Sequence, residues 1–255
     1  MLFRGDGRAL AGCSPRKVQH GGGEAIVLSE PRTISLITEL IHLPMVHAQE
    51  KLREVYQQVC KSCGYENFHR LPSGGATIER KDVEGEGKSV LSFLNDRIQL
   101  TEDHTGASAA QFGKKAIGVL ATTLPALGIP ILLIQQTTVR IITAPNSFRN
   151  ASEYLAKGFF KVRHEDLEPL GRPTNLFGCK LIFPPTQEEP HNFSVRVECY
   201  VRDGRSLYIE NVGTFKTPIQ PASLDTVEKN LKQTADFLVE NVIKFLSVFD
   251  RREPE

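Results

Sequence analysis

Residues 193–214 read FSVRVECYVRDGRSLYIENVGT, and this stretch gives the clearest indication of the fold. Apolar and polar side chains alternate from Phe193 to Val201, which is typical of a strand with one buried face. Asp203-Gly204 predicts a two-residue turn of the primed type, after which residues 206–214 return as a second strand. The stretch therefore predicts an antiparallel hairpin in the second half of the chain.

A long helix is expected after this hairpin. Residues 225–249 carry apolar side chains at spacings of three and four, and Asp225 is its expected N-cap. Before the hairpin, residues 131–143 are rich in Ile, Val and Thr and predict a long strand, and residues 147–160 predict a helix. Residues 131–249 thus read strand, helix, three strands, helix.

The first half of the chain predicts the same order of elements. Gly64 is expected to end its first helix in a left-handed conformation, Ser108 to cap its second helix, and Pro125 to end or kink that helix. The expected elements are a strand at 33–40, a helix at 47–63, strands at 76–80, 88–94 and 97–102, and a helix at 108–124.

The repeated order predicts an α+β fold built from duplicated β-α-β-β-β-α units. We expect a mainly antiparallel sheet with the helices packed on one face. The expected organisation is a flexible tail at 1–32, a first α+β half at 33–130, a second half at 131–250 and a short tail at 251–255.

The composition excludes several classes of protein. Of the 255 residues 40% are hydrophobic and 24% charged, which is ordinary for a soluble globular chain. Lys and Arg number 31 against 30 Asp and Glu, which disfavours nucleic-acid binding through overall charge. No apolar run approaches the ~20 residues that span a bilayer, so no membrane partner is expected. Five cysteines, an odd number, with no secretory signal favour a cytoplasmic location.

The cysteine pair Cys60-x-x-Cys63 is the strongest metal or redox candidate in the sequence. His69 offers a third ligand, but a structural zinc site needs four, and both cysteines fall on the apolar face of their helix. Core packing is the favoured interpretation, and a zinc-stabilised protein is the weaker alternative. The sequence predicts no cofactor and no set of catalytic residues.

The polar side of the sheet is the best candidate surface. If the helices cover the opposite face, a set of charged and aromatic side chains shares it. One interpretation is a solvated face held by cross-strand ion pairs, and the other is a binding platform. The mixture of Arg with Glu favours the solvated, ion-paired face or a protein partner over a phosphate backbone. The candidate residues are Glu39, Arg140, Arg196, Glu198, Tyr200 and Arg202.

The order of elements across residues 33–249 resembles a sporadically distributed bacterial family of uncharacterised proteins. Residues 89–94 with 97–100 look like that family's central hairpin, and residues 138–142 look like its long central strand. The Arg-aromatic-Asn signature usual on that strand is missing here. The family has no established activity, so the resemblance implies an architecture and supplies no site residues.

Two functions are carried forward as hypotheses. The first is a non-catalytic interaction or regulatory module that binds a protein partner, or a second copy of itself, through the sheet face or the cleft between the halves. The second is an enzyme or small-molecule binder whose site lies in that cleft.

Overall fold

The structure is a computed structural model that describes residues 28–81, 85–172, 174 and 177–251. The expectations for residues 1–27 and 252–255 lie outside the described residues. The strands are β1 (Arg32–Ile41), β2 (Asn67–Arg70), β3 (Ala76–Lys81), β4 (Lys88–Phe93), β5 (Arg97–Asp103), β6 (Ile134–Thr143), β7 (Gly178–Phe183), β8 (Asn192–Cys199) and β9 (Leu207–Phe215). The principal helices are α1 (Gln49–Cys63), α2 (Ala109–Leu127) and α5 (Asp225–Asp236).

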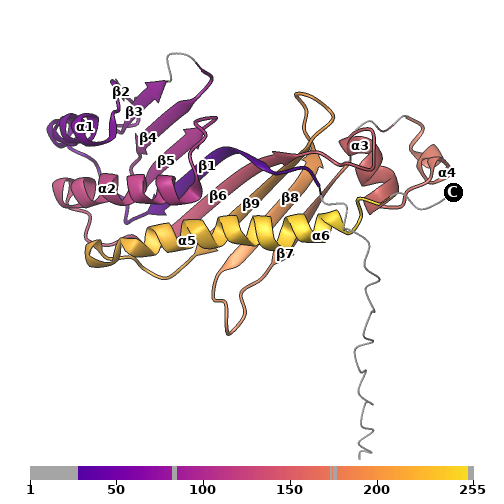
Figure 1. The fold of residues 1–255 in the computed structure, drawn as a ribbon. Coiled ribbons are helices and arrows are strands. Elements are labelled where there is room, and N and C mark those ends of the chain that lie inside the picture. The colour runs from indigo at the N-terminus through magenta and orange to yellow at the C-terminus, as the bar shows by residue number, and fades with distance from the viewer. Residues whose placement is uncertain (1–27, 82–84, 173, 175–176, 252–255) are drawn as a thin grey trace, which may run out of the picture.

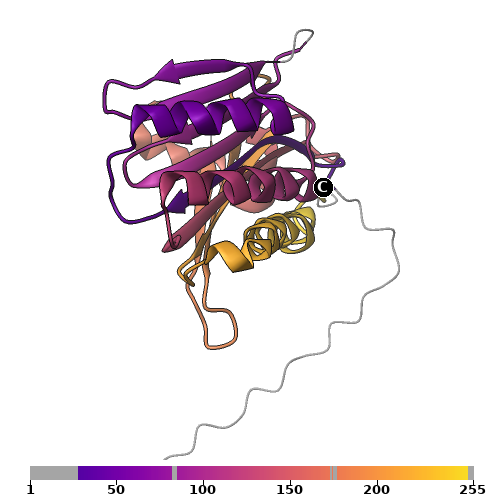
Figure 2. The same ribbon diagram turned by 90° about the vertical axis from the view of Figure 1, so that its left-hand side faces the viewer.

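The nine strands found in the described residues form one antiparallel sheet in the order β2-β3-β4-β5-β1-β6-β9-β8-β7. Figure 1 shows α1, α2 and α5 on the same side of the strands, and Figure 2 shows the three helices stacked side by side. The α+β class with a mainly antiparallel sheet is therefore confirmed. The order of strands places β1 and β6, one from each half, next to each other at the centre.

Each strand divides its side chains between the two faces of the sheet. On β1, Leu36 and Leu40 are buried beneath the helices, whereas Ile37 and Glu39 point to the other side. We call this second side the open face. The same alternation runs through β5, β6, β8 and β9, so the helix side of the sheet forms the main core.

A network of buried amides lies on the helix side, where the two halves meet. The Gln135 amide nitrogen donates to Thr38 Oγ1 at 3.2 Å and to the Val227 carbonyl at 3.1 Å. Asn230 donates in turn to Gln135 Oε1 at 2.8 Å. Because buried amides must find partners, this network links β1, β6 and α5 in one arrangement.

Helix α2 begins as predicted but ends later. Ser108 Oγ accepts from the Gln111 amide, and the Gln111 side chain accepts from the Ser108 amide, forming a capping box. Of the two expected effects of Pro125, an end or a kink, the end is wrong, because the helix continues to Leu127 and its C-cap is Gly128 with φ 70°. Pro125 lies in the last turn, where the missing N–H costs only one intrahelical hydrogen bond.

The last helix is continuous but changes its winding. Helix α5 passes into a π-helical segment, η4 (Phe237–Ile243), and then into α6 (Lys244–Ser247). The expected Asp225 cap is wrong, because Asp225 is the first helical residue, and its carboxylate accepts from Lys229 Nζ at 2.6 Å. The helix expected at 147–160 is likewise short: α3 (Ala151–Glu153) leads into a π-helical turn, η1 (Tyr154–Phe159).

Short helical turns complete the set of elements. They are α4 (His164–Leu167), η2 (Glu168–Leu170) and η3 (Pro221–Ser223). At the start of the described chain, Leu28 is buried and the Ser29 amide donates to the Ala144 carbonyl at 3.0 Å. Residues assigned to a tail on sequence grounds thus already contact the fold.

Three features of the strands differ from expectation. The first half has four strands after α1, because β2 was missed, and the sequence located no residues for β7. The predicted two-residue turn is wrong: Cys199 pairs with Leu207, and the Tyr200 amide donates to the Ser206 carbonyl at 2.8 Å, which leaves residues 201–205 as the turn. Asp203 explains the longer turn, because its carboxylate accepts from the amides of Arg205 and Ser206.

Candidate functional site

One row of side chains crosses the open face from strand to strand at a single register. Each member lies directly opposite the next in the neighbouring strand, and all but one are charged. The row, which we call the transverse row, runs through Lys81, Lys88, Asp103, Ser35, Arg140, Glu210, Arg196 and Lys180. It is the most extended charged feature that the pairing of the strands creates.

Glu210 is the centre of the second-half part of this row. Its carboxylate accepts from Arg140 Nε at 2.7 Å on one side, and Arg196 Nη2 lies 3.2 Å from it on the other. The Glu210 side chain is only 14% exposed, so the two ion pairs are partly shielded from water. Arg196 also lies 3.6 Å from Glu198 Oε1, on its own strand.

The charge state of Glu210 follows from two opposed effects. Burial disfavours the carboxylate, but the hydrogen bonds from Arg140 and Tyr208, with the charges of Arg140 and Arg196, outweigh it and lower the pKa of Glu210. Burial and the neighbouring carboxylate raise the pKa of Tyr208. The cluster therefore holds an ionised carboxylate and a neutral phenol, which suits an ion-paired surface more than proton transfer.

Two tyrosines extend this cluster along the open face. Tyr208 OH donates to Glu210 Oε2 at 2.9 Å, and the Arg196 guanidinium lies 5.2 Å from the centre of the Tyr208 ring. The Tyr200 and Tyr208 rings stack with centroids 6.5 Å apart and an interplanar angle of 7°. Stacked rings beside arginine form a flat, amphipathic surface of the kind enriched in protein interfaces.

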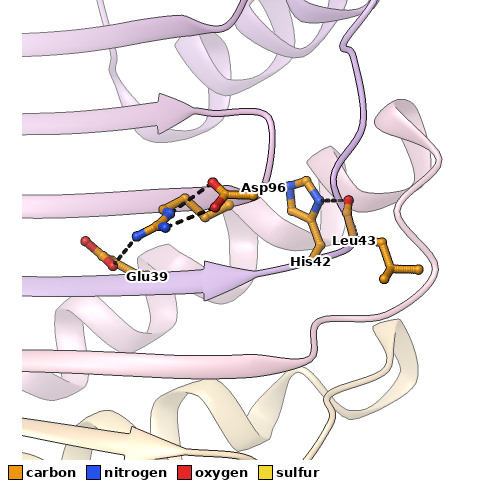
Figure 3. A network of polar contacts seen from close by, with 5 residues as sticks. Glu39, His42, Leu43 and Asp96 are labelled. Atoms are coloured by element: carbon orange, nitrogen blue, oxygen red, sulfur yellow. Dashed lines mark hydrogen bonds and ion pairs between the residues drawn. The ribbon is translucent and has the colours of Figure 1, made fainter.

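A second polar network on the open face involves Glu39. Arg97 Nη1 donates to Glu39 Oε2 at 3.1 Å, while its Nε and Nη2 bond both oxygens of Asp96 at 3.1 and 3.0 Å (Figure 3). The hydrogen bonds and charge of Arg97 lower the pKa of Asp96. The fork of Arg97 is thus already occupied within the chain.

His42 lies beside this network but is buried. Its Nδ1 is 2.8 Å from the Leu43 carbonyl (Figure 3), and its Nε2 has no hydrogen-bond partner among the described residues. Burial, and then the nearby His47, lower the pKa of His42, against the opposing effects of the Leu43 carbonyl and Asp96. A neutral, buried imidazole is the state that this environment favours.

The structure brings together most of the six predicted surface residues. Arg140 and Arg196 contact Glu210 directly, while Glu198 joins the cluster through Arg196 and Tyr200 through Tyr208. Glu39 belongs to the separate Arg97 network. Arg202 lies apart in the turn 201–205, where its guanidinium is 3.7 Å from Glu86. This exposed pair joins a turn of the second half to a loop of the first, and such pairs contribute little energy.

The cysteine candidates do not converge. Cys60 and Cys63 are free and partly buried, and they pack against the core at the end of α1, while His69 lies on β2. Across the part of the chain that the structure describes, no three His, Cys, Asp or Glu side chains are placed to hold a metal ion.

A polar hollow of about 400 Å³ opens on the helix side, near the start of α2. Arg80, Ser89 and Glu102 lie opposite one another across β3, β4 and β5 and form its floor. Lys115 Nζ bonds Glu102 at 2.6 Å, and Ser89 Oγ donates to the other Glu102 oxygen at 2.7 Å. The hollow lies within the first half, not in a cleft between the halves.

An apolar groove of about 540 Å³ lies at the opposite end of the sheet, between β7 and the last helix. It was not anticipated from the sequence, because β7 itself was not located. Four consecutive β7 residues, 180–183, form one wall, and Phe237, Asn241, Val242 and Phe245 form the other.

Sequence reasoning also missed Tyr208, Glu210 and Lys180. The signal for the first two was present, since Tyr208 and Glu210 share one face of the strand predicted at 206–214. The predicted two-residue turn hid this signal, because it shifts the pairing of the two strands by one residue. Such a shift places each side chain of the second strand opposite a different partner and on the other face of the sheet. Lys180 could be placed only once β7 was known.

No protein-family model matches the chain, and no curated protein is significantly similar to it. The resemblance drawn from the order of elements therefore stays a prediction. Among the described residues, no helix combines the length and the apolar character needed to cross a membrane.

Proposed function

We propose that this chain is a non-catalytic interaction module that binds a protein partner on the open face of its sheet. The observation that carries the proposal is the transverse row. It lies on the side of the sheet opposite the helices and alternates arginine with carboxylate across β6, β9 and β8. Cytoplasmic location is part of the proposal, supported by the four free cysteines among the described residues.

The chemistry of this face favours protein over nucleic acid. Glu210, Glu198 and Glu39 are interleaved with the arginines and would repel a phosphate backbone. Because these side chains are already held by ion pairs within the chain, less side-chain freedom is lost when a partner binds. They provide a rigid pattern of charge that favours one orientation of a complementary surface.

The first experiment is native mass spectrometry of the chain, purified gently from its own host. It is followed by cross-linking with a photoreactive residue placed at the position of Thr138. Thr138 lies on the open face at the middle of β6, and Lys232 on the outside of α5 is the matched position for a control cross-linker. We expect protein cross-links from Thr138 and few from Lys232. A bound small molecule without a protein partner, or cross-links that favour Lys232, would contradict the proposal.

A charge reversal sharpens the same test. Arg196→Glu places a carboxylate beside Glu210 and Glu198, and we expect at least a tenfold loss of partner affinity, about 1.4 kcal/mol. Lys229→Glu is the control, because Lys229 lies on α5 and, among the described residues, forms an ion pair with the exposed Asp225 alone. Equal losses for the two variants would show that the open face has no special role.

A second candidate function is small-molecule binding in the polar hollow. The observation in its favour is the buried Glu102, which orients Lys115 and Ser89 beneath the mouth of the hollow. A ligand in native mass spectra that disappears in Lys115→Met but remains in Lys114→Met would support this function. The proposed interaction module predicts no such ligand.

A further inference from the structure

Within the described residues the sheet ends at β7, which pairs with a strand on one side only. It ends the order of strands and pairs with β8. The free side of such a strand offers backbone N–H and C=O groups to another strand, which is how extended peptides join a sheet. At this edge the second-half part of the transverse row also ends.

The charges of the row alternate up to this edge and then stop alternating. The charges across β6, β9 and β8 are positive, negative and positive, from Arg140, Glu210 and Arg196. Lys180 follows directly opposite Arg196, so two cations stand side by side. No acidic group among the described residues forms an ion pair with Lys180, whereas Arg196 has both Glu210 and Glu198. A carboxylate on a tenth strand would restore the alternation.

The apolar groove lies along the same edge. Successive residues of a strand point to opposite faces, so a hollow lined by all of residues 180–183 must reach the edge of β7 itself. Phe245 is 44% exposed there and Ile182 is 67% exposed. The opposite wall includes three residues of the π-helical segment η4, a helical form found often at functional sites.

We propose that β7 accepts a strand from a partner protein, one that alternates apolar residues with polar ones and carries an acidic residue opposite Lys180. The apolar residues of that strand would lie on the helix side, in the groove, and the carboxylate on the open face. This inference rests on the proposed interaction function and names the chemistry of its partner. In this arrangement the partner forms main-chain hydrogen bonds with β7 in addition to its side-chain contacts with the open face.

A second copy of this chain is the less suitable occupant. Residues 178–183 read GCKLIF and contain no carboxylate, so pairing β7 with another β7 supplies no partner for Lys180. The groove also needs apolar side chains at every second position of the incoming strand. A heterologous strand can meet both requirements at once.

The test uses the full chain and two end-capped, fluorescently labelled peptides. The acidic probe is Thr-Val-Thr-Val-Glu-Val-Thr-Val, and the basic probe has lysine in place of glutamate. By fluorescence anisotropy we expect the acidic probe to bind about fivefold more tightly than the basic one. Hydrogen exchange should show new protection of the backbone amides of residues 178–183 when the acidic probe is bound.

Two pairs of variants make the result specific. Lys180→Glu should reverse the preference between the probes, while Lys81→Glu, at the opposite end of the same row, should leave it unchanged. Phe245→Ala should weaken both probes, while Val248→Ala, on an exposed residue next to the same helix, should weaken neither. Urea unfolding of each variant verifies that it is folded at the temperature of the assay.

Three outcomes would overturn the inference: no binding of the acidic probe up to about 1 mM, equal affinity for the two probes, or equal effects of Lys180→Glu and Lys81→Glu. The proposed function can survive any of them. If partner cross-links from Thr138 persist while the peptides fail, the open face binds protein and only the strand addition is wrong.

Discussion

The two ends of the transverse row carry the same charges in different surroundings. At the first-half end, Lys88 and Lys81 stand side by side on β4 and β3, as Arg196 and Lys180 do on β8 and β7. Lys88 pairs with Glu79 at 3.0 Å, and a further strand, β2, pairs with β3 from Ala76 to Glu79 but stops short of Lys81. At the second-half end the described residues supply no strand beyond β7, and an apolar groove replaces the polar hollow. The two ends thus carry the same pattern of charges but differ in the ion pairs and in the pocket next to them.

The largest expected difference between the ends concerns Gly75, in the turn between β2 and β3, and Gly178, in the last strand β7. A Cβ on Gly75, which precedes β3, would lie 2.1 Å from the Phe93 carbonyl oxygen, whereas one on Gly178, at the start of β7, would lie 3.1 Å from its nearest neighbours. We expect Gly75→Ala to lower the free energy of unfolding by about 3 kcal/mol and Gly178→Ala by less than about 1 kcal/mol. Urea denaturation of both variants measures the difference. Equal losses would mean that the backbone is packed equally closely at the two glycines.

The acidic members of the row should also differ. Glu210→Gln removes the charge that Arg140 and Arg196 share, and we expect a loss of about 1–2 kcal/mol in the free energy of unfolding. Asp103→Asn, the matching change in the first half, should stay within about 0.5 kcal/mol, because no ion pair of Asp103 is seen among the described residues. Chemical denaturation at neutral pH decides between them, and a larger effect of Asp103→Asn would reverse the comparison.

The pH dependence of the Glu210 effect has a definite sign. The folded-state pKa of Glu210 is lowered, so its contribution to stability is complete above the unfolded value of about 4.3 and is lost as pH falls through the folded value. The difference in unfolding free energy between the native chain and Glu210→Gln should therefore shrink below pH ~4.3. A difference that grows on acidification would contradict the assignment of Glu210 as the ionised centre of the row.

The smallest expected effect separates stability from binding. Lys180→Glu replaces two adjacent cations by an attractive pair with Arg196, so the isolated chain should gain about 0.3 kcal/mol. The same change should weaken the acidic probe. Thermal unfolding gives the sign of the change in stability, and fluorescence anisotropy on the same preparation gives the sign of the change in affinity for the acidic probe. A variant that loses stability and binding together would point to a disturbed edge instead of a lost charge contact.

Much of the fold followed from alternation and helical spacing in the sequence. The strand at 33–40 and the helix ending at Gly64 were predicted nearly at their observed bounds, because their buried faces impose clear periods. Strand β7 escaped because its sequence, GCKLIF, ends in three consecutive apolar residues and so lacks a clear alternation, and none of its residues is fully buried. Its absence from the prediction also hid Lys180 and the groove.

The candidate site was predictable in part. Arg140, Arg196 and Glu198 were named from the parity of their strands, and the structure brings them together. Glu210, which joins them, was missed because the register of the hairpin depends on the turn. Asp203 accepts from two backbone amides and extends that turn beyond two residues. Local turn chemistry, not hydrophobic pattern, decided which side chains meet.

The pairing of β1 with β6 has a consequence for how the chain is made. Leu36 lies opposite Val139 across this pair, so the centre of the sheet closes between segments roughly a hundred residues apart in sequence. Contacts of such high sequence separation form slowly. During synthesis β1 can pair with β5 well before β6 leaves the ribosome, and the middle of the finished sheet is then an open edge of a nascent half. When β6 pairs with β1 it covers that edge, and the hydrogen bond from the Gln135 side chain to Thr38 favours the observed register of the pair.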